Sequence, residues 1–90
     1  MADSGNLYGT VIDDQGQALP GVTVTLMGLG PLMVQITDAR GRCRFPNLSP
    51  GTYSLRAQLE GFATVDDRNI QIRVGRNTEV EVEMKPAVTE

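Results

Sequence analysis

The sequence predicts an all-β sandwich built from seven short strands. Apolar and polar residues alternate in several short runs, which is the pattern of a strand with one buried face. Turn-forming residues separate these runs at intervals of about eight to twelve residues, as in sandwiches and small barrels. The 90 residues include ten glycines and five prolines, and no window keeps a helical period. A single domain with one modest core is therefore expected.

Three strands are expected in the first part of the chain. Residues 7–12 form the first strand and end at a turn over residues 13–16. Residues 22–26 alternate strictly and place their apolar side chains on one face. In the strand that follows, Val34 and Ile36 are expected to point into the core.

A turn over residues 38–41 leads to two further strands. Gly41 supplies a positive φ at this turn without steric cost. A loop over residues 47–51, with Pro and Gly at turn positions, separates the two strands. The side chains expected to face the core from these strands are Cys43, Phe45, Tyr53, Leu55 and Ala57.

The last two strands are predicted to form a hairpin through a turn over residues 75–77. Its inward side chains would be Ile70, Ile72, Val74, Val80, Val82 and Met84. Gln71 and Arg73 would then face a row of outward glutamates on the neighbouring strand. Opposite charges across strands stabilise a sheet by a few tenths of a kcal/mol per pair. Such an acidic row also discourages strand addition at a sheet edge. These glutamates are Glu79, Glu81 and Glu83.

Several segments together resemble one known family. Residues 19–25, Leu-Pro-Gly-Val-Thr-Val-Thr, are similar to its second-strand motif, and residues 37–53 are similar to its central hairpin. Residues 55–62 resemble its closing strand and loop. The chain thus resembles the carboxypeptidase regulatory-like domain over residues 6–85, which implies a prealbumin-like Greek-key sandwich. The family occurs beside metallocarboxypeptidase catalytic domains, in secreted bacterial multidomain proteins and ahead of TonB-dependent receptor plugs.

The resemblance divides the chain into a tail, a domain and a linker. Residues 1–5 are expected to be an N-terminal tail and residues 86–90 a C-terminal linker. The first residues do not have the basic and apolar regions of a signal peptide, and no run reaches the roughly 18 apolar residues of a membrane-spanning helix. We expect a module excised from a larger exported or cell-envelope protein, for example a TonB-dependent receptor-like protein; the alternative is a cytoplasmic protein.

The sequence offers no recognisable catalytic group. Without any histidine, it has no Ser-His or Cys-His dyad and no His-ligated zinc. Transthyretin-like hydrolases and intradiol dioxygenases, which share the implied fold, depend on histidine, so neither activity carries over. The single cysteine, Cys43, is expected to be a small buried hydrophobe. The sequence therefore predicts a protein that is not an enzyme, with no catalytic residue, no metal ligand and no cofactor.

Two other kinds of chemistry are unfavoured alternatives. The pairs Asp13-Asp14 and Asp66-Asp67 could contribute to a calcium site, but calcium needs about six to eight oxygen ligands and the spacing does not supply them. An intramolecular isopeptide bond would need a buried lysine, and Lys85, the only lysine, stands at the end of the last strand.

Two groups of residues are candidates for binding. Flexible glycines separate apolar residues between the second and third strands, and an exposed apolar patch often marks a partner surface. The candidate partner surface consists of Met27, Leu29, Leu32 and Met33. The alternative is a loop that folds back over the core. Arg44 and Arg56, expected to face outward on neighbouring strands, are weak candidates for an anion site.

The predicted function is a non-catalytic structural or protein-interaction module. Its partners would be neighbouring domains of a parent protein or another protein, at the cell envelope or outside the cell. A net charge of −3 argues against nucleic acid and an anionic membrane surface as partners. Because no long apolar run is present, direct membrane insertion is not expected either. The alternative is a carbohydrate-binding sandwich, for which Tyr8 is the one aromatic side chain not committed to the core.

Overall fold

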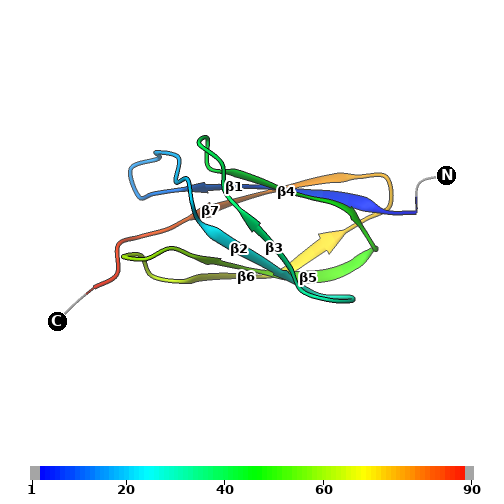
Figure 1. Cartoon of the computed structure of the whole chain (residues 1–90). Coiled ribbons are helices and arrows are strands. Elements are labelled where there is room, and N and C mark those ends of the chain that lie inside the picture. The colour runs from blue at the N-terminus through cyan, green and yellow to red at the C-terminus, as the bar shows by residue number, and fades with distance from the viewer. Residues whose placement is uncertain (1–2, 89–90) are drawn as a thin grey trace.

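The computed structural model describes residues 3–88 as two β-sheets packed face to face (Figure 1). Sheet A has the strand order β4-β1-β7, and sheet B has the order β3-β2-β5-β6. The seven strands are β1 (Gly5–Ile12), β2 (Thr23–Met27), β3 (Met33–Ile36), β4 (Arg42–Leu48), β5 (Gly51–Gln58), β6 (Val65–Ile72) and β7 (Asn77–Glu83). The predicted all-β, seven-stranded Greek-key sandwich is confirmed.

The predicted hairpin between the last two strands is wrong. β6 lies in sheet B, whereas β7 lies in sheet A and runs parallel to β1. The turn between them is tied to the start of β1, because Gly75 donates its N–H to the carbonyl of Ser4 and Asn6 donates to the carbonyl of Arg76, both at 2.9 Å. These bonds place the start of β7 beside β1. The expected ladder between Gln71 or Arg73 and the glutamates of β7 is therefore not formed.

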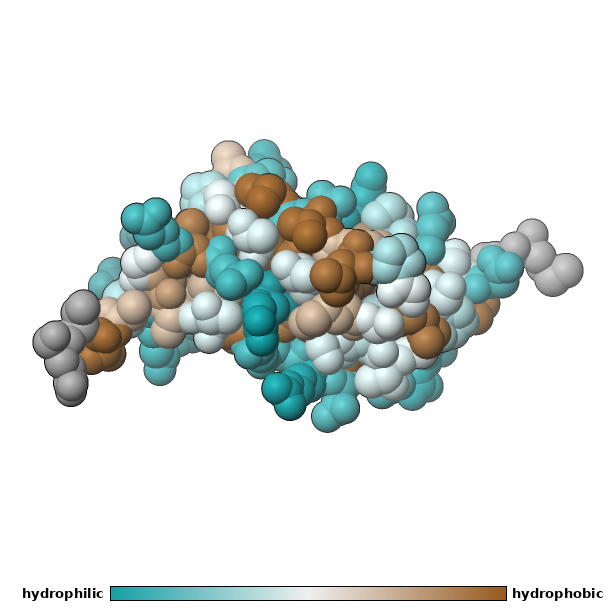
Figure 2. Space-filling view, turned by 60° about the horizontal axis from the view of Figure 1, so that its bottom comes forward, coloured by the Kyte–Doolittle hydropathy of each residue, from teal (hydrophilic) through white to brown (hydrophobic). Residues whose placement is uncertain are grey.

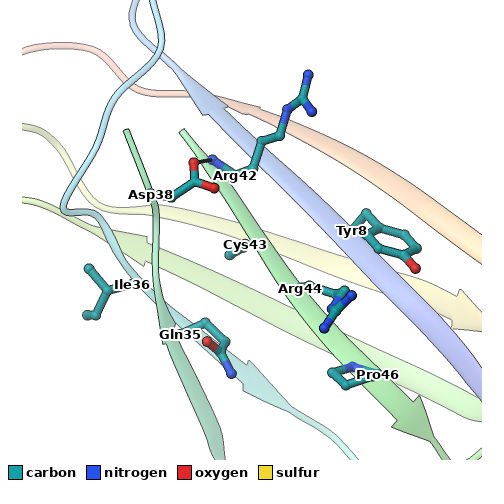
Figure 3. Close-up of a pocket in the computed structure, with 8 residues that line it drawn as sticks. All are labelled: Tyr8, Gln35, Ile36, Asp38, Arg42, Cys43, Arg44 and Pro46. Carbon is teal, nitrogen blue, oxygen red and sulfur yellow. Dashed lines mark hydrogen bonds between the residues drawn. The ribbon is translucent and has the colours of Figure 1, made fainter. Parts of the chain in front are cut away.

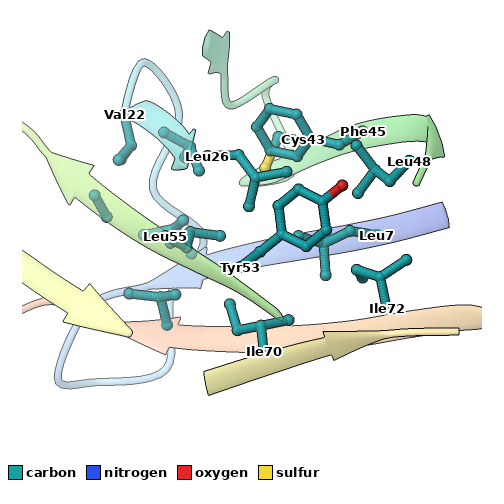
Figure 4. Close-up of a cluster of buried hydrophobic side chains, with 14 of the residues drawn as sticks. Leu7, Val22, Leu26, Cys43, Phe45, Leu48, Tyr53, Leu55, Ile70 and Ile72 are labelled. Atoms are coloured by element: carbon teal, nitrogen blue, oxygen red, sulfur yellow. The ribbon is translucent and has the colours of Figure 1, made fainter. Parts of the chain in front are cut away.

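The core lies between the sheets, and the predicted inward rows of β2, β4 and β5 are confirmed. Tyr53 lies in the middle of this core (Figure 4), and its hydroxyl donates to the carbonyl of Ser49 at 2.7 Å. This hydrogen bond satisfies the polar end of an otherwise buried ring. The buried apolar residues are Leu7, Val11, Val22, Val24, Leu26, Cys43, Phe45, Leu48, Tyr53, Leu55, Ala57, Ile70, Ile72, Val82 and Met84.

The predicted orientation of β3 is wrong by one residue. Val34 and Ile36 point away from the core and are 54% and 55% exposed, while Met33 packs against the core. The cause is Thr37, which is buried at the end of the strand. Its hydroxyl accepts the N–H of Val22 at 2.8 Å and donates to the carbonyl of Leu19 at 2.7 Å. Because successive side chains alternate between faces, an inward Thr37 turns Ile36 and Val34 outward.

The ends of the strands account for two smaller differences. Val74, expected to face inward, is 50% exposed because β6 ends at Ile72 and the chain turns at Gly75, where φ is 71°. Near the C-terminus, Ala87 donates its N–H to the carbonyl of Gly61 at 2.9 Å, so the start of the expected linker 86–90 is bonded to the domain. Residues 1–2 and 89–90, at the outer ends of the expected tail and linker, lie outside the described residues.

Candidate interaction surface

Four exposed apolar side chains lie on β3 and on the loop that connects β2 to β3. Their exposed fractions range from 54% to 65%, although most large apolar side chains of the domain are buried. Figure 2, which views the molecule from the side of sheet B, shows brown apolar side chains gathered among polar ones. We call this group the β3 patch. It consists of Leu29, Leu32, Val34 and Ile36.

The β3 patch overlaps only in part with the surface predicted from the sequence. Leu29 and Leu32 are exposed as that prediction requires. Met27 and Met33 are half-buried, and Met33 packs against the core. Gly28 explains the path of this segment, because a side chain there would collide with the ring of Tyr53, so the backbone runs close over the ring. The patch thus continues from the loop onto the outer face of β3.

A cavity of about 440 Å³ opens beside the β3 patch, between the edges of the two sheets. Gln35 and Ile36 leave β3 on opposite sides, with Gln35 on the side of β4 (Figure 3). Arg44 and Pro46 line the cavity from β4, and Tyr8 lines it from β1. The remaining lining residues are Asp38, Arg42 and Cys43. An apolar surface and a polar cavity therefore meet at one sheet edge.

The cavity carries two arginines and one aspartate. Within residues 3–88 the one ion pair joins Arg56 to Asp66, so neither Arg42 nor Arg44 lies within ion-pair distance of a carboxylate there. The backbone N–H groups of Arg42 and Arg40 donate to a carboxylate oxygen of Asp38 at 3.0 and 2.9 Å. These hydrogen bonds hold the pKa of Asp38 below its ordinary value. Asp38 is therefore a turn-forming carboxylate that is ionised at neutral pH.

The predicted anion site of Arg44 and Arg56 is not formed. Arg44 lies on β4 in sheet A and Arg56 on β5 in sheet B, so the two strands are not neighbours. Arg56 instead donates from Nε to Asp66 on β6 at 2.7 Å. This pairing lowers the pKa of Asp66 and raises that of Arg56.

Cys43 is a core residue of β4, as predicted. Burial raises the pKa of its thiol, so the thiol is protonated at neutral pH and is a poor nucleophile. Opposite Cys43 in the β1–β4 ladder is Gly9, where a Cβ would lie only 2.9 Å from the sulfur. The cysteine thus fills space that the glycine of the neighbouring strand leaves open.

The acidic turns have structural partners. Asp13 accepts the backbone N–H groups of Gln15 and Gln17 at 2.8 and 2.9 Å, which closes the turn after β1. Within the described chain, no three His, Cys, Asp or Glu side chains come together as a metal site would require. Lys85 is exposed, whereas the isopeptide alternative would need a buried lysine. No helix among residues 3–88 has the length and apolar character needed to cross a membrane.

Comparison with known proteins decides the family. The model of the carboxypeptidase regulatory-like domain matches residues 6–85, which include nearly all of both sheets. The chain belongs to this family. Its sandwich is accordingly a prealbumin-like one.

Relatives of this carboxypeptidase regulatory-like domain are much longer proteins. The chain is 39% identical over 89 residues to the TonB-dependent transporter Oar of Myxococcus xanthus, covering 96% of the chain and 8% of the transporter. It is 31% identical over 74 residues to human carboxypeptidase D, covering 82% of the chain and 5% of the enzyme. The chain therefore spans a small part of each relative's length.

A solved structure supports the same fold. The Bacillus anthracis TIE protein superimposes with a TM-score of 0.80 at 17% identity, over 93% of this chain and 17% of that protein. At this identity the likeness concerns the fold alone. Function belongs to sites and not to folds, so the function has to be inferred from the β3 patch and the cavity beside it.

Proposed function

We propose that this domain is a non-catalytic interaction module of a larger exported or cell-envelope protein, and that its β3 patch docks against a neighbouring domain. The β3 patch carries the proposal, because an exposed apolar group at an open sheet edge is typical of an interaction surface. The similarity to a bacterial TonB-dependent transporter, of which the chain covers 8%, supports a place in a longer envelope protein.

The size of the β3 patch favours a neighbour in the same polypeptide. Full burial of an aliphatic side chain contributes about 1.5–3 kcal/mol, and the patch side chains are already close to half buried. Completing their burial would therefore contribute roughly 3–6 kcal/mol in total, before the cost of association. For two separate molecules this corresponds to a weak complex, whereas a tethered neighbour benefits from a high effective concentration.

The size and cellular fraction of the native gene product test the proposal. An antibody against this domain is expected to detect, in source cells, a polypeptide much heavier than the 9.7 kDa of this chain. That polypeptide should partition with the cell envelope or the culture medium. A product of 9.7 kDa in the cytosolic fraction would contradict the proposal.

Carbohydrate binding is the second candidate, and one observation favours it. Tyr8 is half-buried beside the cavity and is not part of the core. Sugar-binding sandwiches use such aromatic faces as platforms, but Phe45 and Tyr53 are buried and the chain has no tryptophan. Titration with soluble polysaccharides separates the two candidates. Saturable binding that disappears in Tyr8→Ala would establish this second function.

A further inference from the structure

The two sheets present four edge strands, and three of them carry features that discourage strand addition. β4 contains Pro46 and has Asn47 at a positive φ of 58°. β6 contains Asn69 at a positive φ of 64°, and its ladder with β5 has a register shift. β7 presents a row of glutamates on its outward face. Proline, irregular backbone and charge are the devices that natural sheets use to protect an edge.

The edge of β3 has no proline, irregular backbone or charge, and its short length of four residues is the one such device that it carries. Its residues Met33–Ile36 are uncharged, contain no proline and have no positive φ. Thr37 uses both its N–H and its carbonyl in bonds to the segment leading into β2, at 2.9 and 3.0 Å. Antiparallel strands alternate residues that bond to the partner with residues that do not. Gln35 therefore bonds toward β2, and the N–H and carbonyl groups of Val34 and Ile36 point away from sheet B.

A strand added at this edge would have two different faces. Its side chains beside Val34 and Ile36 would lie on the outer face, next to the apolar β3 patch. The alternate side chains, beside Gln35, would point toward the cavity that Arg42 and Arg44 line. Arg44 lies in that lining without a carboxylate partner among residues 3–88, and the carboxylate of Asp38 already accepts two backbone N–H groups. The cavity side of the added strand would therefore favour acidic side chains.

We propose that β3 accepts an extended segment of a partner, in which apolar and acidic residues alternate, as an additional strand of sheet B. The inference rests on the proposed function and names the chemistry of what docks on the β3 patch. A second copy of this chain fits less well, because its own Arg42 and Arg44 would approach the same cavity. β3 also has only four residues, too few to bury the roughly 1,200 Å² of a standard interface.

A short blocked peptide in which Glu and Val alternate is the probe, with a peptide of alternating Lys and Val as its control. In NMR titrations the Glu peptide is expected to shift the amide signals of Val34 and Ile36 and to slow their hydrogen exchange. The Lys peptide should bind several-fold more weakly, and added salt should weaken the Glu peptide's binding. No binding of the Glu peptide, or equal binding of both peptides, would overturn the proposal.

Two substitutions at Val34 isolate the contribution of backbone hydrogen bonds to peptide binding. Val34→Pro removes an N–H that sheet B does not use, so the domain should keep its fold, as its own NMR spectrum can verify. It should weaken peptide binding by at least about tenfold, since proline also blocks the approach of the strand. Val34→Thr keeps the N–H and should weaken binding by less. Unchanged binding in Val34→Pro would exclude strand addition.

Charge reversal tests the cavity side of the added strand. Arg44→Glu should weaken binding of the Glu peptide and strengthen binding of the Lys peptide, whereas Arg73→Glu on the far edge should change neither. Dimerisation in sedimentation experiments that Val34→Pro abolishes would identify a second copy as the occupant and overturn the proposal. A partner that still docks on Leu32 in the Val34→Pro variant would also overturn strand addition, while leaving the proposed function intact.

Discussion

Replacing Phe45 with Ala is expected to lower the free energy of unfolding by about 3–5 kcal/mol. Phe45 is 1% exposed and is among the largest fully buried side chains. It projects from β4 into the core shared by both sheets, so its removal leaves a cavity that the paired strands cannot easily close. Since small domains are stable by only about 5–15 kcal/mol, a large part of the total would be lost. Urea unfolding followed by circular dichroism measures the change.

Phe62→Ala provides the matched control for this prediction. Phe62 is the same residue type but is only partly buried, packed against the core from the loop after β5. Replacing Phe62 with Ala should therefore lower the free energy of unfolding by clearly less than replacing Phe45. If the two substitutions cost the same, or if Phe45→Ala costs less than about 1 kcal/mol, the core has been assigned incorrectly.

Thr37→Val is the second substitution with a large expected effect. Valine has nearly the same shape, but it removes the hydroxyl that bonds to the N–H of Val22 and the carbonyl of Leu19. An unsatisfied buried backbone group costs about 1–3 kcal/mol. The bond to Val22 is buried and the bond to Leu19 is partly buried, so their combined loss should lower the free energy of unfolding by roughly 2–5 kcal/mol, which thermal or urea unfolding would detect.

Thr25→Val separates the hydrogen bonds of Thr37 from a general effect of losing a threonine. Thr25 lies on the outward, half-exposed face of β2, and its substitution should change stability by less than about 0.5 kcal/mol. Equal losses in the two variants would mean that the hydroxyl of Thr37 does not anchor β3.

The sequence predicts where the strands lie better than it predicts which strands pair with one another. β2 and β5 each have a single apolar face, so their alternation determines which residues are buried. The segment from β6 to β7 has the turn signals of a hairpin, but local signals do not reveal which sheet a strand joins. Bonds from the turn to Ser4 and Asn6, far away in the sequence, place β7 beside β1. Only the tertiary structure contains that information.

The sequence likewise predicts only part of the β3 patch. Leu29 and Leu32 stand out because they lie among glycines, and both are exposed. The side chains on both faces of β3 include apolar ones, so alternation alone could not choose between Met33 and Val34 for the core. The buried hydroxyl of Thr37 makes that choice. The pairing of Arg44 with Arg56 was wrong because strands consecutive in sequence need not share a sheet.

A photo-crosslinking residue at position 32 of the native gene product tests the central claim most directly. The β3 patch is expected to crosslink, in the source cells, to one defined protein segment outside residues 1–90, identified by mass spectrometry. The same residue at position 81, on the exposed acidic face of β7, should give little or no such product. Equal yields at both positions, or no protein crosslink at position 32, would contradict the assignment of the β3 patch as a docking surface.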